Sequence, residues 1–167
     1  SLLFFLHMKT LLLSFFTTAL LISNAFADSY KVDEVKVYKS ENRMVMLYKG
    51  KITKEYEVML GRGGEGPKVQ EGDNLVPEGS YKLTVKNPKS LYYKSIRINY
   101  PNKQDIKKAK ELGVDPGGDI YIHGTPNSQF GSWVFGNWTR GCVAVTNDEM
   151  DEIWDNVQVP TPITIYP

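Results

Sequence analysis

The sequence contains few of the residues that bind metals or form disulfides. It has one cysteine, Cys142, and two histidines, of which His7 lies in the apolar N-terminal stretch. A single cysteine allows no intramolecular disulfide, and a free thiol in an oxidising compartment is either reactive or unusually well protected. One further histidine and one cysteine also supply too few ligands for a typical zinc site. We therefore expect no metal and no other cofactor.

The sequence also lacks a strong net charge and a phosphate-binding glycine loop. Its formal net charge is +1, and removal of residues 1–27 brings it to 0 because Lys9 is lost without any acidic residue. A neutral domain has no electrostatic footprint for nucleic acid or an anionic membrane. The glycine-rich run 61–66 precedes no predicted helix and lacks the P-loop lysine. We therefore expect no nucleic-acid partner. We also expect the protein to be a monomer.

The one long apolar run, Leu11 to Ile22, is shorter than the about 20 residues that a transmembrane helix needs. A positive segment beginning at Met8, a plausible start, precedes it, and Ala25-Phe26-Ala27 follows as a small-x-small cleavage site. This order predicts a secretory signal peptide at residues 1–27 and an exported domain at 28–167, in the periplasm or cell-wall space. An uncleaved membrane anchor is the alternative. No cysteine marks a lipoprotein anchor at the cleavage site.

Most of the predicted domain has the alternating pattern of β-strands. The predicted strands are 32–38, 44–48, 52–60, 81–85, 95–99 and 163–166, together with short runs ending at His123 and starting after Cys142. Lys49-Gly50-Lys51 indicates a tight hairpin, and Asn87-Pro88 is expected to end the strand before it. Residues 61–74 form a long polar loop, which is either functional or a connector.

Two short helices complete the prediction. Residues 103–112 form a charged helix with Gly113 as its C-cap. A capping box of Thr146 and Glu149 begins the second helix, whose apolar residues recur at helical spacing from Met150 to Val157. The fold class is therefore mainly β: one domain, a sandwich or irregular barrel of mixed strands, with two short helices.

Cys142 and His123 lie in similar sequence settings. His123 ends an apolar run and precedes Gly124, whereas Cys142 follows Gly141 and begins a β-branched run. Either residue alone is more often an inert buried or surface group. Together, at glycine-flanked strand ends, they indicate a thiol nucleophile and the imidazole that activates it. In papain-like peptidases the cysteine precedes the histidine, which is the reverse of the order here.

These motifs resemble the active-site signature of the L,D-transpeptidase (YkuD-type) catalytic domain family. His123-Gly124 matches the first part of the signature, the run from Thr139 to Val143 matches the second, and Asn147 matches a later asparagine. Ala144 departs from the pattern, because many members carry Arg or Asn there. The runs Gly72-Asp73 to Tyr81 and Pro116 to Ile120 are similar to the YafK-type branch, and the looser resemblance extends from Val32 to the C-terminus.

The resemblance implies an enzyme that acts on the peptide stems of peptidoglycan through a thioester on Cys142. A backbone carbonyl near Gly124 would orient His123. From the chemistry, the N–H groups of Gly141 and Cys142 could stabilise the oxyanion. Candidate substrate-binding residues are Arg140, Thr139 and Asn147. Arg140 is equally well explained as a solvated arginine, and Asn147 also fits a helix start.

Several alternatives remain open at the level of sequence. The acyl acceptor could be an amine, which gives cross-links, or water, as in hydrolytic relatives that trim stems or release a wall-attached lipoprotein. A silent peptidoglycan-binding domain is the alternative of another class. Four aromatic residues in the loop before Cys142 could form a lid over a cleft or close the core: Phe130, Trp133, Phe135 and Trp138.

Overall fold

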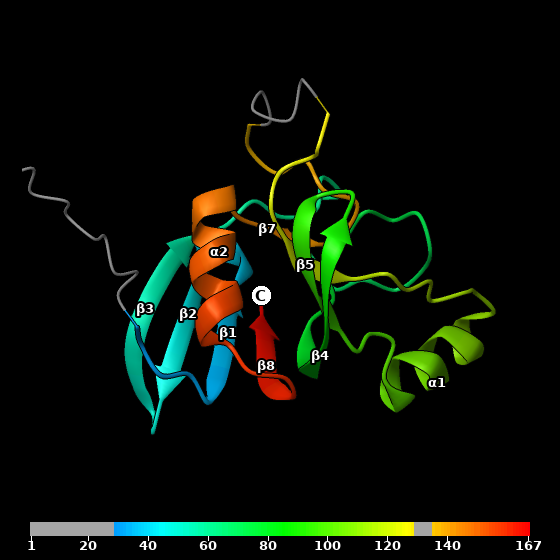
Figure 1. Ribbon diagram of the computed structural model, residues 1–167. Coiled ribbons are helices and arrows are strands. Elements are labelled where there is room, and N and C mark those ends of the chain that lie inside the picture. The colour runs from blue at the N-terminus through cyan, green and yellow to red at the C-terminus, as the bar shows by residue number, and fades with distance from the viewer. Residues whose placement is uncertain (1–28, 129–134) are drawn as a thin grey trace, which may run out of the picture.

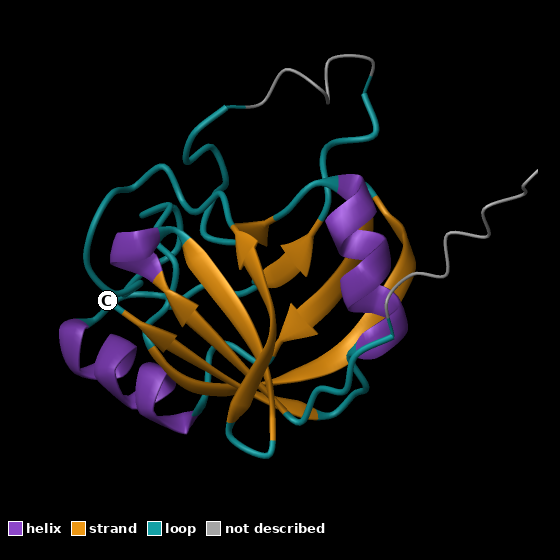
Figure 2. Ribbon diagram, turned by 90° about the vertical axis from the view of Figure 1, so that its left-hand side faces the viewer, coloured by secondary structure: helices purple, strands orange, loops and turns teal. Residues whose placement is uncertain are grey.

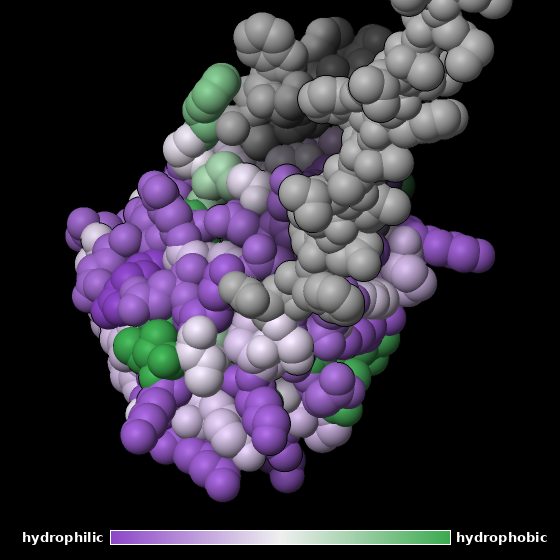
Figure 3. Space-filling view, turned by 60° about the vertical axis from the view of Figure 1, so that its left-hand side comes forward, coloured by the Kyte–Doolittle hydropathy of each residue, from purple (hydrophilic) through white to green (hydrophobic). Residues whose placement is uncertain are grey.

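The structure, a computed structural model, describes residues 29–128 and 135–167. The predicted signal peptide and two of the four loop aromatics, Phe130 and Trp133, lie outside the described residues. Within the described part, no helix is both long enough and apolar enough to cross a membrane. The face of the molecule in Figure 3 is mostly polar, with hydrophobic residues in separate small groups.

In the described residues, eight strands form one mixed sheet; of the two α-helices, one packs against the sheet and the other lies to one side of it (Figure 1). The elements in chain order are β1 (Glu34–Tyr38), a 3-10 turn (Lys39–Glu41), β2 (Arg43–Tyr48), β3 (Lys51–Glu57), β4 (Gly79–Ser90), β5 (Tyr93–Ile98), α1 (Lys103–Leu112), β6 (Tyr121–His123), β7 (Val143–Ala144), α2 (Asn147–Asn156) and β8 (Thr161–Tyr166). The strand order across the sheet is β3-β2-β1-β8-β4-β5-β6-β7. The prediction of a mainly β fold with mixed strands and two short helices is confirmed.

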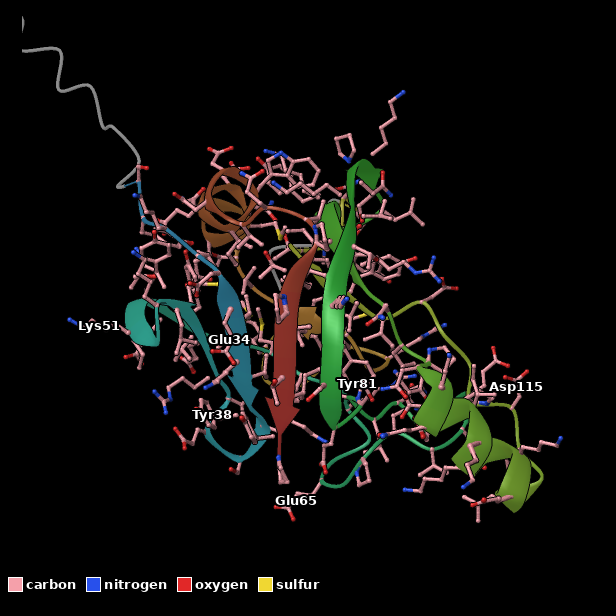
Figure 4. All side chains as sticks on the ribbon, turned by 90° about the horizontal axis from the view of Figure 1, so that it is seen from below. Glu34, Tyr38, Lys51, Glu65, Tyr81 and Asp115 are labelled. Atoms are coloured by element: carbon pink, nitrogen blue, oxygen red, sulfur yellow. The ribbon has the colours of Figure 1, made fainter. Side chains whose placement is uncertain are left out.

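The last strand of the chain lies in the middle of the sheet. Strand β8 pairs in parallel with β1 and antiparallel with β4, as the neighbouring blue, red and green strands in Figure 4 show. The sheet then curls, so that Met59, just after one edge strand, forms an isolated bridge with Ala144 in the other edge strand. This bridge draws the two edges together into an irregular barrel. The side chains enclosed by it form a continuous apolar core.

The first three strands form an antiparallel meander, whose second turn is the predicted hairpin. Lys49 and Gly50 both have positive φ angles, 52° and 74°, which is the geometry of a two-residue hairpin turn that matches the twist of a sheet. Strand β1 alternates partly exposed and fully buried residues, with Val35 and Val37 in the core. The alternation that predicted these strands therefore reports which face of the sheet is buried.

The prediction that Asn87-Pro88 ends a strand is wrong. Strand β4 continues through Pro88 to Ser90, with two shifts of register against β5. The pairing of β4 with β8 stops at Leu83, so beyond that point only one side of β4 is hydrogen-bonded. A proline lacks an N–H donor but is tolerated where a strand edge is free or bulged. The sequence gives no sign that β8, the second neighbour of β4, stops pairing before Pro88 is reached.

The two predicted helices are confirmed. Helix α1 ends at Gly113, which has a φ of 69°. Helix α2 begins with the predicted capping box of Thr146 and Glu149. It buries Met150 and Ile153 in the core and packs beside β5, against the curled sheet (Figure 2). The N-terminus of α2 thereby lies close to the end of β6, where His123 is found.

Candidate active site

A pocket of about 550 Å³ opens where β6 and β7 meet two flanking segments. One flanking segment is the hairpin between β4 and β5, and the other is the loop of residues 61–74. His123 and Cys142 both line this pocket. The loop of 61–74, for which the sequence left two interpretations open, is therefore part of the wall of the pocket.

Parallel pairing of β6 with β7 places the imidazole and the thiol in the same pocket. His123 pairs with Ala144, so Cys142, two residues earlier, lies beside Tyr121. Residues two apart on a strand face the same side, and the side chains of Tyr121, His123 and Cys142 all line the pocket. One strand spacing across and two residues along place the Cα atoms of His123 and Cys142 about 8 Å apart. Side chains that point into the same pocket can meet across that distance.

The hydrogen bond of His123 defines its tautomer. Nδ1 lies 2.7 Å from the main-chain oxygen of Gly124, and because a carbonyl only accepts, Nδ1 must donate. In a neutral imidazole this leaves Nε2 as the proton acceptor. Burial lowers the pKa of His123, against a smaller opposing effect of the Gly124 carbonyl. The ring is therefore neutral near pH 7 and can act as a base through Nε2.

Two aromatic residues enclose the ring of His123. The ring centroid of Tyr92 lies 4.6 Å from that of His123, and the centroid of Trp138 lies 5.6 Å away in an edge-on arrangement. Tyr92 comes from the β4–β5 hairpin, and no spacing in the sequence singled it out. Trp138 combines the two interpretations of the loop aromatics, because it lines the pocket while its indole N–H contacts Met59 Sδ at 3.3 Å. Phe135, in contrast, is 80% exposed and is not part of the core.

The thiol of Cys142 is protonated at rest. Sγ lies 3.5 Å from the main-chain oxygen of Asp119 and donates to it. Burial raises the pKa of the Cys142 thiol to about 11, and the Asp119 carboxylate also raises it. A hydrogen bond from the Tyr121 main chain and the charge of Lys68 act in the opposite direction and lower the pKa. With a neutral imidazole and a protonated thiol, the pair resembles general-base activation rather than a preformed ion pair.

The variant Asp119→Asn should make Cys142 more reactive towards alkylation. The carboxylate raises the pKa of the thiol, so its removal should lower that pKa and move the pH profile of iodoacetamide labelling down by about half a unit. Asn tolerates the positive φ of 56° at this position and can still accept the hydrogen bond of Tyr121 Oη. Asp115→Asn, on the preceding turn, is the matched control. An unchanged or upward-shifted profile for Asp119→Asn would contradict the prediction.

The turn before Cys142 is fixed by Thr139 and by a close approach at Gly141. Thr139 is buried, and its hydroxyl donates to the carbonyl of Cys142 at 2.7 Å and accepts from the N–H of Gly141 at 3.2 Å. The hydroxyl of Thr139 is thus used within the protein, so its predicted contact with substrate stays a prediction. The N–H of Gly141, predicted as an oxyanion donor, is already bonded in this structure.

Gly141→Ala should destabilise the protein and impair the site. The φ of Gly141 is 123°, and a Cβ built on it would lie 2.7 Å from the main-chain oxygen of Leu75. A side chain meets both backbone strain and a clash with an atom that has little freedom to move. We expect a loss of about 1–3 kcal/mol in the free energy of unfolding, measured by urea denaturation. Gly64→Ala, at a positive φ but with open space around it, separates strain from the clash.

Asn147, the first residue of α2, holds the turn after His123. Its Oδ1 accepts from the N–H of Thr125 at 2.9 Å and from the hydroxyl of Thr125 at 3.0 Å. Gly124 leaves room for this contact, because a Cβ there would lie 2.5 Å from the same oxygen. Asn147 thus helps to place the Gly124 carbonyl against His123. Contact of Asn147 with substrate remains untested.

Arg140 is exposed and lines the pocket beside Cys142. Its position therefore allows the predicted contact with substrate and also fits a solvated arginine. Within the described residues, no group of three or more His, Cys, Asp or Glu side chains could hold a metal ion. The predicted site residues thus fall into two sets: groups that face the pocket, and groups behind it that shape its backbone.

The fold and the pocket define a mainly β domain with a thiol and an imidazole on adjacent parallel strands. Residues 33–165 match the L,D-transpeptidase catalytic domain family (YkuD), and the chain belongs to this family. YafK of Escherichia coli K12 and YqjB of Bacillus subtilis 168, both named provisionally as L,D-transpeptidases, are each 30% identical to it. The alignments cover 80% and 78% of this chain, over 146 and 138 residues.

A solved structure shares the same architecture. The helical cell shape determining protein Pgp2 of Campylobacter jejuni superposes with a TM-score of 0.61 and 29% identity over 79% of this chain. The alignments cover 53% of YafK, 69% of YqjB and 46% of the Pgp2 chain. The chain thus spans about half the length of two of these proteins. Its similarity to them concerns the catalytic domain.

Proposed function

We propose that this protein is an exported, cysteine-dependent L,D-transpeptidase that acts on peptidoglycan stem peptides in cell-wall cross-linking or remodelling. Membership of the L,D-transpeptidase family supports this class of reaction. The observation that carries the proposal is the pairing of His123 and Cys142 in one pocket, with Nδ1 of His123 bonded to the Gly124 carbonyl. That bond leaves Nε2 as the base that a thiol nucleophile needs.

In the proposed reaction, Nε2 of His123 takes the thiol proton while Sγ of Cys142 attacks the carbonyl of the L-centre of the diamino acid in the stem. The tetrahedral intermediate collapses as the bond to the following D-residue breaks, and the leaving amine takes the proton from His123. An acceptor amine then attacks the thioester and gives its proton to His123. The thiolate leaves and recovers this proton, which regenerates the resting pair.

The oxyanion in this scheme needs donors that are free during the reaction. Because the N–H of Gly141 contacts Thr139 Oγ1 at the long distance of 3.2 Å, it can turn to a stronger acceptor when the intermediate forms. The N–H of Cys142 is the second proposed donor. Arg140 is proposed to bind a stem carboxylate from the exposed side of the pocket, because a guanidinium forms paired bonds to carboxylates.

The test is incubation of residues 28–167 with purified disaccharide-peptide stems, with and without an added amine acceptor, followed by mass spectrometry. A cross-linked product that depends on Cys142 supports transpeptidation. A shortened stem alone would make the protein an L,D-carboxypeptidase instead. Release of a stem from a wall-attached lipoprotein would identify an amidase. If no product and no adduct on Cys142 forms with any of these substrates, the protein is a peptidoglycan-binding domain.

Export is the second part of the proposal. It rests on the sequence of residues 1–27, and its test is the N-terminal sequence of the protein secreted by a Gram-negative host. A mature terminus at Asp28 in the periplasmic fraction would support the signal peptide. A protein that retains residues 1–27 and sediments with membranes would favour the anchor.

A further inference from the structure

Lys68 is a buried lysine in the wall of the pocket. Its side chain is only 3% exposed, yet it lines the pocket together with Cys142. Its Nζ donates to the side chain of Asp73 at 2.8 Å and to the carbonyl of Gln70 at 2.9 Å. An ammonium group has three N–H donors, and these two acceptors account for two of them. The same Nζ also lies over the ring of Tyr100, 6.0 Å from its centroid.

Asp73 forms the centre of the loop that carries Lys68. Besides Lys68, the carboxylate accepts from three main-chain N–H groups, those of Val69, Gln70 and Leu75, at 2.8–3.0 Å. The negative charge of Asp73 is therefore spread over four donors, and only one of them is the ammonium. The pair is a dipole, and its positive end faces the pocket, because Lys68 lines the pocket and Asp73 does not.

The same loop supports the turn that carries Cys142. The carbonyl of Leu75, whose N–H is held by Asp73, lies against Gly141, so closely that only glycine fits there. Gly61 makes a similar approach, because a Cβ on it would lie 2.1 Å from the Asn74 carbonyl and 3.3 Å from the Cα of Gly141. The pair of Lys68 and Asp73 therefore fixes backbone that touches the residue before the thiol.

The charges around the thiol differ in their burial. Besides His123 and Tyr92, the ionisable groups that line the pocket are Lys68, Glu71, Lys89, Asp119, Tyr121 and Arg140. Of the charged groups among them, Lys68 alone is buried, and water screens the exposed ones more strongly. His123 is neutral near pH 7, so it offers the thiol a base but no counter-charge. Lys68 is therefore the one buried positive charge among the residues that line the pocket.

We propose that Lys68 is a positioning residue, which is held by Asp73 and favours the thiolate of Cys142 by supplying a buried positive charge to the pocket. The inference rests on the proposed role of Cys142 as nucleophile. In the reaction, Lys68 gives and takes no proton. Its charge lowers the energy of the anionic sulfur, both when the thiol is deprotonated and when the thioester breaks. The charge of Lys68 lowers the pKa of the Cys142 thiol, which is the direction expected for a nearby cation.

The test is the pH profile of iodoacetamide labelling of Cys142, the only cysteine in the chain. Lys68→Met should move the profile up by about half to one pH unit, a 3–10-fold lower labelling rate at pH 8. The matched control is Lys39→Met. Lys39 is also buried and forms a 2.8 Å ion pair with Glu78, but it lies outside this pocket and has three acceptors. Its profile should equal that of the wild type.

Opposite shifts separate the charge from damage to the loop. Asp73→Asn keeps Lys68 but removes its counter-charge, so the labelling profile should move down, whereas a merely disturbed loop would move both profiles in one direction. This variant also serves if Lys68→Met fails to fold, as judged by thermal unfolding. An unchanged profile for a folded Lys68→Met, or an upward shift for Asp73→Asn, would overturn the proposal. Labelling needs no substrate, so it tests the role of Lys68 separately from the proposed function, which the stem-processing assay of Cys142→Ala tests.

Discussion

Replacement of Cys142 by alanine should abolish stem processing, with a fall in kcat/KM of at least about a thousandfold. The thiol is the proposed nucleophile, and among the residues that line its pocket no second thiol could replace it. Cys142→Ser is the closest variant in size, and it should be similarly inactive, because His123 must then activate a much weaker acid. Mass spectrometry of stem products measures both variants.

Chemical blocking provides the control for Cys142. Alkylation of the wild type labels this one side chain, and activity should fall in proportion to the labelled fraction. The free energy of unfolding of Cys142→Ala, measured in urea, should stay within about 1–2 kcal/mol of the wild type, because only one sulfur atom is removed. An alanine variant that folds and still converts stems at more than a tenth of the wild-type rate would exclude the thioester mechanism.

Replacement of His123 by glutamine should lower kcat by about 100- to 10,000-fold. Glutamine is close in size to the imidazole, but it cannot take a proton from the thiol at neutral pH. The wild-type rate should fall at low pH as His123 becomes protonated, and this fall should lie below pH 6.5 because burial lowers the pKa of the ring. Single-turnover acylation of a stem peptide across pH 4–9 measures both effects.

Tyr92→Phe is the matched control for His123→Gln, since it keeps the aromatic ring beside His123 and removes only the hydroxyl. Its acid limb should coincide with that of the wild type. If His123→Gln retains the wild-type acid limb, another group supplies the base, and the assignment of His123 fails. If it loses that limb and most of its rate, the imidazole is the base.

The sequence predicted the elements of the fold whose signals are local. The capping box of Thr146 and Glu149 and the C-cap at Gly113 depend on residues within one or two turns, and both were located correctly. The continuation of β4 past Pro88 depends on where β8 stops pairing, almost 80 residues further along the chain. Information of that kind is absent from any short window of sequence.

The residues of the site also divide into those with a local signal in the sequence and those without one. His123 and Cys142 could be predicted because each is rare and stands beside a glycine at the end of a strand. Tyr92, Asp119 and Lys68 could not, since each reaches the pocket through the tertiary arrangement of its own segment and has many equivalents in the sequence. Glycine content offered a weak signal: the closely packed Gly61 and Gly141 mark where backbone segments meet. Spacing alone does not distinguish these from glycines in open turns.

The position of β8 has a consequence for the order in which the chain acquires its structure. This strand joins β1 to β4, so the middle of the sheet cannot form until residues 161–166 have been synthesised. Pairing of β1 with β8 is a slow step, because the two strands are far apart in the sequence. The entropy of closing the chain between them is lost before their contacts stabilise the pair. The core is therefore complete only when β8 has inserted between β1 and β4.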